Sequence, residues 1–517
     1  MKKALAFALI LALAATGLTA AAKENAVTVR VGGAAVIFPD AQPFVDENGR
    51  VQAPVRAIAE ALGQTVKWNE AAQAVFIGGD NGGGDGTGKG GGGEGGITIV
   101  IGSNEIKRGS ETIKMDTAAV IKEGRTFVPA RFVAECFGYE VKWDGGANRA
   151  DLIRKPQGGF DLAMLQDMPK DKNYMFSPFS LKMALAMAAN GAEGETRSEI
   201  LDVLGIADLE LFNSAAKKFI EDSNRNSAVK FNIANSIWHN SDFYGDAALD
   251  FSDGYKSVIK NNYLGAAEKI DNATGAKTVN DWISAATMKK ITNVINDDVV
   301  KKSLSFLVNT IYFKGDWAVP FKAEATGDNI FTERGGAKKT AKFMNQTGYY
   351  DYFENAGFQM LAKPYKDNNI KMYFILPKND KPISGADFKS AADSMGTENV
   401  RLSLPKFKTE YLHSDLRIML RGMGIQTAFD ADKADFNKMY SKKPADNVFI
   451  GLILQKTFIE VDEKGTEAAA ATVIAMAAGA MPPEKTIEFI CDKPFIYIIR
   501  DDATGEILFF GEYAYVE

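Results

Sequence analysis

Residues 460–472 read Glu-Val-Asp-Glu-Lys-Gly-Thr-Glu-Ala-Ala-Ala-Ala-Thr, so a strand-like acidic segment runs into four consecutive alanines. Taken alone, the alanine-rich stretch 468–481 is compatible with a surface helix, because alanine has the highest helix propensity. The β-branched run 472–474 and Gly479 disfavour that helix. A membrane span is also disfavoured, because the stretch falls short of the ~20 residues that cross a bilayer. An extended segment of small residues is the favoured interpretation, with a surface helix as the alternative.

Distinctive runs also lie upstream of this segment. Residues 307–315 read Leu-Val-Asn-Thr-Ile-Tyr-Phe-Lys-Gly, an apolar strand closed by glycine, and Trp317 follows. Residues 173–178 read Asn-Tyr-Met-Phe-Ser-Pro and lead into a predicted helix. From about Pro156 onward the texture is α+β, with no further glycine-rich linker. These runs, in this order, closely resemble a serpin, and the resemblance covers residues 160–517.

The resemblance implies both a fold and a function. The fold would be α+β, with a large central β-sheet A, sheets B and C, and about nine helices. The protein would be an irreversible suicide inhibitor: a serine protease cleaves an exposed loop, becomes trapped as an acyl-enzyme, and the loop inserts into sheet A. We therefore expect no catalytic residue, no metal, no cofactor and no enzymatic activity of its own. The alternative is a non-inhibitory serpin that serves as a binding or display module.

The resemblance places the hinge of the inserting loop within residues 463–472. Because strand side chains alternate between faces, every second hinge residue must enter the packed interior. Those residues would be small and uncharged, whereas Glu467, of opposite parity, would stay in solvent. This composition favours inhibition. The hinge set is Glu463, Gly465, Thr466, Glu467, Ala468, Ala469, Ala470, Ala471 and Thr472, of which Thr466, Ala468, Ala470 and Thr472 would point inward.

The same resemblance places the bond that the protease attacks between Gly479 and Ala480. The Pro-Pro-Glu run at 482–484 supports this register, and Ala478 and Met481 are the fallback cleavage positions. Small residues suit a shallow specificity pocket, as in elastase-like or subtilisin-like proteases. Trypsin-like targets are disfavoured, because no arginine or lysine lies between Lys464 and Lys485.

Two supporting regions of the sheet are also implied by the resemblance. The shutter, where the sheet parts, would comprise Ser177, Ser180, Asn309 and Gln455. The breach, at the top of the sheet, would comprise Trp317, Lys406 and Glu463, with Lys406 and Glu463 paired. Gln455 stands where the family has a histidine, so we expect opening of the sheet to lack a histidine-linked pH dependence. Ordinary packing or a surface ion pair is the alternative for each residue.

Residues 27–154 contain one unit repeated at an interval of 75 residues. Gly49-Arg50 recurs as Gly124-Arg125, and the Val-Lys-Trp run ending at Trp68 recurs at Trp143. This segment resembles the two-repeat stalk domain named after the N-terminus of copper amine oxidases, although it has no histidine to hold copper. We expect a structural spacer in contact with the cell wall, with Cys136 as a buried thiol. Both tryptophans are expected in its core, and sugar stacking is the alternative for them. The glycine-rich insert 78–96 is expected to be a flexible linker.

The beginning of the chain and its composition support the remaining predictions, which concern localisation, nucleic-acid binding and metal sites. Lys2 and Lys3 precede an apolar stretch and three alanines end at residue 22, so residues 1–22 are predicted to be a signal peptide, followed by the stalk and a serpin domain at 156–517. We expect a secreted or cell-surface protein with no membrane span after signal removal. A net charge of −6 disfavours nucleic-acid binding. The two cysteines and two histidines lack metal-site spacing.

Overall fold

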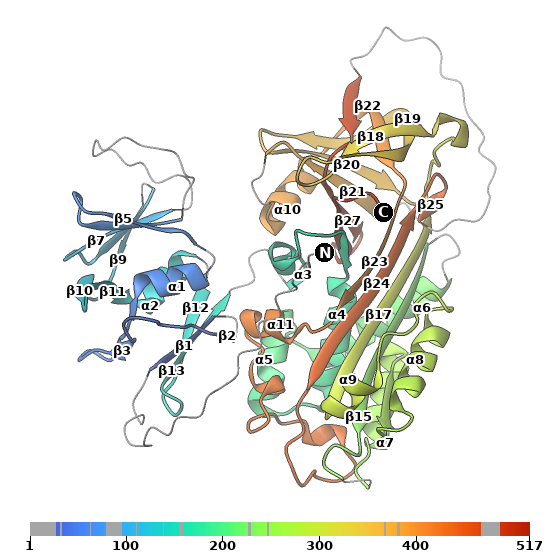
Figure 1. Ribbon diagram of the computed structural model, residues 1–517. Coiled ribbons are helices and arrows are strands. Elements are labelled where there is room, and N and C mark those ends of the chain that lie inside the picture. The colour runs from blue at the N-terminus through green and yellow to red at the C-terminus, as the bar shows by residue number, and fades with distance from the viewer. Residues whose placement is uncertain are drawn as a thin grey trace, which may run out of the picture. The chain divides into compact units, whose positions relative to one another are not determined.

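The computed structural model describes residues 27–31, 34–62, 64–78, 96–109, 111–137, 139–154, 160–225, 229–245, 248–366, 369–379, 383–466 and 486–517. The chain divides into two compact units, Met1–Leu152 and Ile153–Glu517 (Figure 1). The predicted signal peptide and almost all of the glycine-rich insert lie outside the described residues.

The first unit consists of two copies of one motif. The strands β4 and β11 pair antiparallel at its centre, with Ala53 opposite Val128. These two positions differ by the repeat interval (128 − 53 = 75), so the copies meet about an approximate two-fold axis. The hydrogen-bonded strand orders are β12-β13-β1-β2, β10-β11-β4-β3 and β5-β6-β7-β8-β9. The elements are β1 Thr28–Val31, β2 Ala34–Ala35, β3 Phe44–Val45, β4 Val51–Pro54, α1 Val55–Ala61, β5 Val66–Asn69, β6 Ala74–Ile77, β7 Ile97–Val100, β8 Glu105–Arg108, β9 Glu111–Lys114, β10 Val120–Lys122, β11 Arg125–Pro129, α2 Ala130–Cys136, β12 Tyr139–Asp144 and β13 Arg149–Arg154.

The expectation that both repeat tryptophans lie in the core is wrong. Trp68 is 38% exposed and Trp143 is 46% exposed. The reason is their place in the sheets: β5 and β12 are terminal strands, so each has a neighbouring strand on one side only. The core is filled instead by residues of the two helices, such as Ile58 and Val133. Cys136 is buried, as predicted, and burial raises its pKa to about 11.

The second unit is built around a central sheet of long strands. Its order is β16-β15-β17-β24-β23, with the short β25 entering between β17 and β24 at one end (Figure 1). The second hydrogen-bonded path runs β14-β28-β27-β21-β20-β19-β22-β26, and β18 pairs with β19. The strand bounds are β14 Tyr174–Phe176, β15 Val229–Asn240, β16 Ala266–Ile270, β17 Ser305–Asp316, β18 Gly327–Thr332, β19 Lys338–Glu354, β20 Phe358–Pro364, β21 Ile370–Pro377, β22 Gly396–Pro405, β23 Phe407–His413, β24 Leu452–Val461, β25 Gly465–Thr466, β26 Ile487–Ile490, β27 Phe495–Asp501 and β28 Ile507–Tyr513.

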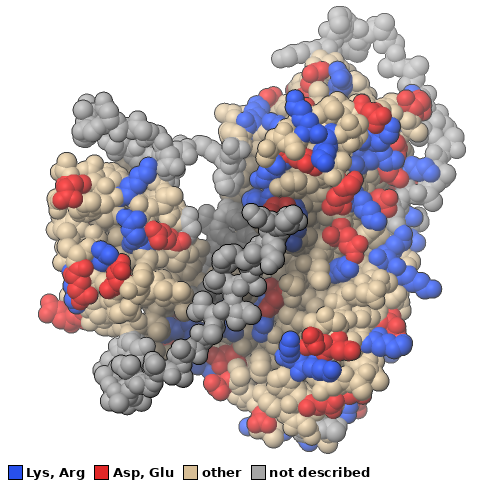
Figure 2. All heavy atoms as spheres, in the orientation of Figure 1, with Lys and Arg blue, Asp and Glu red and all other residues tan. Residues whose placement is uncertain are grey.

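Helices cover both faces of the central sheet. Within the described residues of this unit they are α3 Phe160–Ala163, α4 Pro178–Gly191, α5 Gly194–Leu204, α6 Leu209–Arg225, α7 Asp253–Tyr263, α8 Gly275–Ala286, α9 Asp297–Lys302, α10 Gly385–Asp393 and α11 Arg417–Met423. This confirms the predicted α+β architecture with about nine helices. No helix in the described ranges is long and apolar enough to cross a bilayer. On the visible face of the unit, acidic and basic side chains are interspersed (Figure 2).

The strand β17 is buried on both faces, which explains its almost continuous apolar sequence. Leu307 and Ile311 face the larger core, and Val308 and Tyr312 face a smaller core under α8. The helix α4 packs against β15, β17 and β28, and most of its residues are buried. It begins at Pro178, whose missing N–H suits the first helical position. The odd-numbered residues of β17, Asn309 among them, therefore face α4.

Candidate functional site: the breach and the shutter of the central sheet

The strands β17 and β24 are direct neighbours along part of their length only. They pair in parallel from Phe306 opposite Leu452 to Tyr312 opposite Phe458. Beyond that point β25 lies between them and pairs antiparallel with both, Thr466 facing Gly315 on one side and Val461 on the other. A third strand thus begins between β17 and β24, and it is made by the chain that has just left β24.

Two small residues, Gly465 and Thr466, allow β25 to enter between β17 and β24. A Cβ atom on Gly465 would lie 2.1 Å from the carbonyl oxygen of Gly315, so only glycine fits there. Thr466 is fully buried, and its hydroxyl lies 2.8 Å from the hydroxyl of Tyr365. The side chain of Thr466 therefore lies in the interior. The remaining hinge residues, Glu467, Ala468, Ala469, Ala470, Ala471 and Thr472, lie outside the described residues, as do the predicted bond Gly479–Ala480 and the fallback positions Ala478 and Met481.

The breach residues surround the turn between β24 and β25. Lys406 Nζ lies 2.8 Å from Glu463 Oε2, and the Thr326 hydroxyl donates to Glu463 Oε1 over 2.9 Å. Burial alone would raise the pKa of Glu463, but the hydrogen bonds, that from Lys406 above all, hold it below its usual value. Trp317 donates from its indole nitrogen to the carbonyl of Asp462 over 3.1 Å and stacks on Tyr365. The structure therefore brings Trp317, Lys406 and Glu463 together.

A buried lysine, Lys363, lies beside the breach and was not predicted from the sequence. Lys363 is 1% exposed, and its ammonium donates to the Val319 carbonyl over 2.9 Å and to Gln346 Oε1 over 2.8 Å. The same ammonium lies 5.3 Å from the ring centre of Trp317 and 4.4 Å from that of Phe321. Burial lowers the pKa of Lys363 to about 7. No motif or pattern in the sequence marks this burial or the aromatic surroundings.

The shutter residues form one buried network that joins α4 to the central sheet. Gln455 accepts from the Ser177 backbone over 2.8 Å and donates to the Ser177 carbonyl over 2.9 Å. It also donates to Asn309, which in turn donates to Ser180. The Ser177 hydroxyl donates to the Leu508 carbonyl over 2.7 Å. Ser177, Ser180, Asn309 and Gln455 are all fully buried, so the structure brings all four predicted shutter residues together.

Asn235 of β15 belongs to the same network and was missed by the sequence analysis. It is fully buried, accepts from Asn309 and donates to the Ser180 carbonyl over 3.3 Å. Its register partner is Asn309, whose partner on the other side is Gln455. A row of amide side chains thus crosses three strands. A buried asparagine in an apolar strand is the only local signal, and the register that completes the row is not visible in the sequence.

The row continues to a histidine on the next strand. His413 of β23 is the register partner of Gln455, and its Nε2 lies 3.3 Å from the carbonyl oxygen of Met175. Its ring packs against those of Phe176 and Tyr411. Burial lowers the pKa of His413 to about 4, and the nearby Lys172 acts in the same direction. The position that the family gives to histidine is thus held by Gln455, while a different histidine lies one strand away, and the absence of a histidine-linked pH dependence of sheet opening stays a prediction.

Comparison with known proteins identifies the family to which the chain belongs. Residues 158–516 match the family model "Serpin (serine protease inhibitor)". The chain is 34% identical over 362 residues to the leukocyte elastase inhibitor of Xenopus laevis, with 66% of this chain and 93% of that protein covered. The chain belongs to the serpin family.

Solved serpin structures agree with this assignment. The native state of the thermophilic serpin tengpin superposes with a TM-score of 0.63 at 28% identity, covering 69% of this chain and 93% of that one. Serpin48 of Tenebrio molitor gives a TM-score of 0.58 at 26% identity, covering 68% and 94%. The first unit has its own match, since residues 30–152 fit the family model of the copper amine oxidase N-terminal domain. This serpin thus carries an additional domain on its N-terminal side.

The described residues were also compared with the arrangements that metal or nucleophilic chemistry needs. They contain no group of three or more metal-ligating side chains. His413 faces a backbone carbonyl and aromatic rings, and His239 lies beside Tyr440 with its Nδ1 3.2 Å from the tyrosine hydroxyl. Neither described contact is that of a base holding a nucleophile. The site is instead the part of the central sheet where β17 and β24 can separate and a further strand can pair between them.

Proposed function

We propose that this serpin is an irreversible suicide inhibitor of serine proteases with shallow specificity pockets, elastase-like or subtilisin-like. A protease would cleave between Gly479 and Ala480 and remain attached as an acyl-enzyme. The hinge that begins at Glu463 would then continue between β17 and β24. The observation that carries this proposal is β25, which already occupies the first step of that path with Thr466 buried and Gly465 against Gly315.

Insertion in this direction adds hydrogen bonds between strands, which favours it. Where β17 and β24 pair with each other they share one ladder of hydrogen bonds, and an inserted strand replaces that ladder with two. Each added bond contributes about 0.5–1.5 kcal/mol net. The shutter network must open and close again around the new strand. A protease dragged by the loop would lose its oxyanion geometry, at about 100-fold or more in deacylation rate per lost donor, so the ester would persist.

The relatives support the protease class. The Xenopus laevis protein is named a leukocyte elastase inhibitor, and the family model describes serine protease inhibitors. The fold is also that of human thyroxine-binding globulin, at 24% identity and a TM-score of 0.60. The small residues of the predicted hinge and bond, Ala468 to Thr472 and Gly479–Ala480, are what favour inhibition here.

The remaining parts of the chain fit an extracellular inhibitor. Residues 1–22 would direct export, and residues 27–154 would act as a spacer in contact with the cell wall. The inhibitory domain, residues 156–517, would then meet proteases outside the cell. The stability of the whole chain outside the cell would not depend on disulfides, because Cys136 and Cys491 are both free and buried.

The decisive experiment is a denaturing gel of the protein after incubation with an elastase or a subtilisin. We expect an SDS-resistant adduct, accompanied by a peptide whose mass reports cleavage at Gly479–Ala480. The test variant is Thr466→Arg, because its guanidinium would have to occupy the buried position that Thr466 already fills at the start of β25, which would oppose entry of the hinge by several kcal/mol. We expect the adduct to fall at least about tenfold while loop cleavage continues.

The matched control is Glu467→Arg, which adds an arginine one position further on, at the parity predicted to face solvent. It should form the adduct nearly as well as the parent. Equal inhibition by the parent and Thr466→Arg would overturn the hinge argument. Cleavage of the parent without any adduct would overturn the proposed function and favour a non-inhibitory binding or display module.

A further inference from the structure

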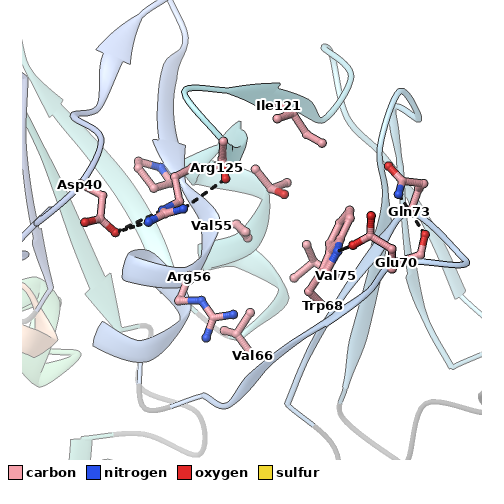
Figure 3. Close-up of a pocket in the computed structure, with 13 residues that line it drawn as sticks. Asp40, Val55, Arg56, Val66, Trp68, Glu70, Gln73, Val75, Ile121 and Arg125 are labelled. Atoms are coloured by element: carbon pink, nitrogen blue, oxygen red, sulfur yellow. Dashed lines mark hydrogen bonds and ion pairs between the residues drawn. The ribbon is translucent and has the colours of Figure 1, made fainter.

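A groove in the first unit combines an exposed aromatic ring with a small set of polar groups. Its cavity measures about 590 Å³ and is bounded by Val55 and Arg125 on one side and by Trp68 and Val75 on the other (Figure 3). The groove lies where the two repeats meet, because Arg125 belongs to the second repeat and the other three residues to the first. Its size and its mixture of apolar walls with few polar groups are those of a ligand site.

Trp68 is the most informative residue of this groove. It leaves 38% of its surface in solvent, although burial of so large a side chain would stabilise the fold. Its indole N–H is already bonded to Glu70 Oε2 over 2.8 Å. That bond fixes the ring, so its face is held ready for a flat apolar partner without loss of side-chain freedom on binding.

The polar groups around the groove are planar and balanced in charge. Arg125 Nη2 lies 2.6 Å from Asp40 Oδ2, and Arg56, which is paired with Glu60 at 3.6 Å, is a second arginine that lines the groove (Figure 3). Among the residues that line the groove, the charges of two arginines are thus balanced by those of two carboxylates, Asp40 and Glu70. A groove balanced in charge gives no net attraction to a polyanion, which favours a neutral polar ligand.

We propose that this groove binds a neutral, β-linked polysaccharide chain of the kind that builds cell walls. A β-linked pyranose presents a flat C–H face, which would stack on the ring of Trp68. Its ring hydroxyls would hydrogen bond to Arg56, Arg125 and the carboxylates. This deepens the wall contact proposed above for residues 27–154 and names the chemistry that would mediate it.

The repeat supplies a matched control within the same domain. Trp143 occupies the position equivalent to Trp68 and is also exposed, but Gly145 stands where the first repeat has Glu70 (145 − 70 = 75). The second tryptophan therefore lacks the carboxylate that fixes the first. The two rings are alike in size and exposure and differ in how they are held, so an effect of Trp68 that Trp143 does not share identifies the groove.

The experiment measures binding of cello-oligosaccharides and chito-oligosaccharides to the mature full-length chain by tryptophan fluorescence and calorimetry. We expect Trp68→Ala to weaken binding about tenfold or more, since stacking is lost. Trp68→Phe should keep most of the affinity, and Glu70→Gln should weaken it by a few-fold because the ring is held less firmly. Trp143→Ala should change the affinity less than twofold.

Absence of any oligosaccharide binding by the parent would overturn the proposal, and so would equal losses in Trp68→Ala and Trp143→Ala. Circular dichroism of each variant confirms that the domain is folded, and the Trp68→Phe variant preserves the test if Trp68→Ala is not. Adduct formation with a protease, measured on the same preparations, reports the inhibitory function separately. Sedimentation with isolated cell walls separates the wall contact from the groove: sedimentation without oligosaccharide binding would leave the wall contact standing and overturn the groove.

Discussion

The breach and the shutter hold the same two strands, β17 and β24, by different means. At the breach the contacts are partly exposed: the side chain of Lys406 is 40% exposed and that of its partner Glu463 is 16% exposed. At the shutter every polar residue is fully buried and bonded to another. The breach already admits β25, whereas the shutter joins the strands without an intervening residue.

This difference indicates how the sheet is controlled. Exposed ion pairs contribute little, about 0–1 kcal/mol, and their partners can return to water when they separate. Buried amides have no water to return to, so each bond broken there costs about 1–3 kcal/mol until it is remade. The end of the sheet is therefore easy to enter, and the main barrier to further insertion is expected at the shutter.

The largest effect is expected from Asn309→Ala. Removal of this amide leaves Ser180, Asn235 and Gln455 with unsatisfied buried groups, so the free energy of unfolding should fall by about 3–5 kcal/mol. Urea denaturation measures this change. The control is Asn399→Ala, which removes an exposed bond to Thr486 and should cost less than about 0.5 kcal/mol. Similar losses in the two variants would mean that the buried row is not special.

A smaller effect, confined to acid, is expected from His413 beside the shutter. Its native pKa of about 4 lies below the ordinary 6.5, so the unfolded state binds the extra proton first. Stability is therefore full above pH 6.5 and falls as the pH drops toward 4, by an amount on the order of 3 kcal/mol. His413→Asn, which keeps a donor for the Met175 carbonyl, should remove this part of the slope. An unchanged slope between pH 6.5 and 4 would contradict the assignment.

At the breach, Lys363→Met should stabilise the protein by about 1–3 kcal/mol at pH 7, because a buried ammonium without a carboxylate partner is replaced by an apolar chain of similar length. The native pKa of about 7 lies below the ordinary 10.5, so the stability of the parent should rise between these pH values. Unfolding measured at pH 7 and pH 9 should show this rise in the parent and a flatter profile in the variant. A loss of stability at both pH values would show that the aromatic surroundings more than compensate for burial.

The smallest effect is expected from Lys406→Met, which removes the ion pair with Glu463. The pair is partly exposed, so the loss should stay below about 1 kcal/mol and shrink further in 1 M salt. Thr326 would still hold the carboxylate of Glu463. A loss as large as that of Asn309→Ala would remove the distinction between breach and shutter.

Much of the second unit was predictable, because its motifs carry their own constraints. The apolar run 307–315 predicted a strand, and β17 is one. The motif residues Ser177, Ser180, Asn309 and Gln455 converge in one network. Alternation along the hinge placed Thr466 inward, and it is buried at the start of β25. Each of these features follows from strand periodicity or from a run of residues specific enough to identify a family.

The features that were predicted wrongly or not predicted have a different cause. Trp68 and Trp143 were expected in the core because large aromatic residues usually are, but they lie on strands at the ends of their sheets. Asn235 and His413 lie in the shutter row because of the register between strands. Lys363 lies beside aromatic rings because of tertiary packing. None of these relations has a local signature.

The sequence by itself determined the order of the elements, the family of residues 158–516 and the small side chains that a strand inside a sheet requires. Only the tertiary structure decided which side chains meet across the strands, how far β25 enters between β17 and β24, and which aromatic rings remain in solvent. The physical reason is that backbone propensity and periodicity act over a few neighbouring residues. Register and burial, in contrast, are set by packing between segments that are distant in the chain.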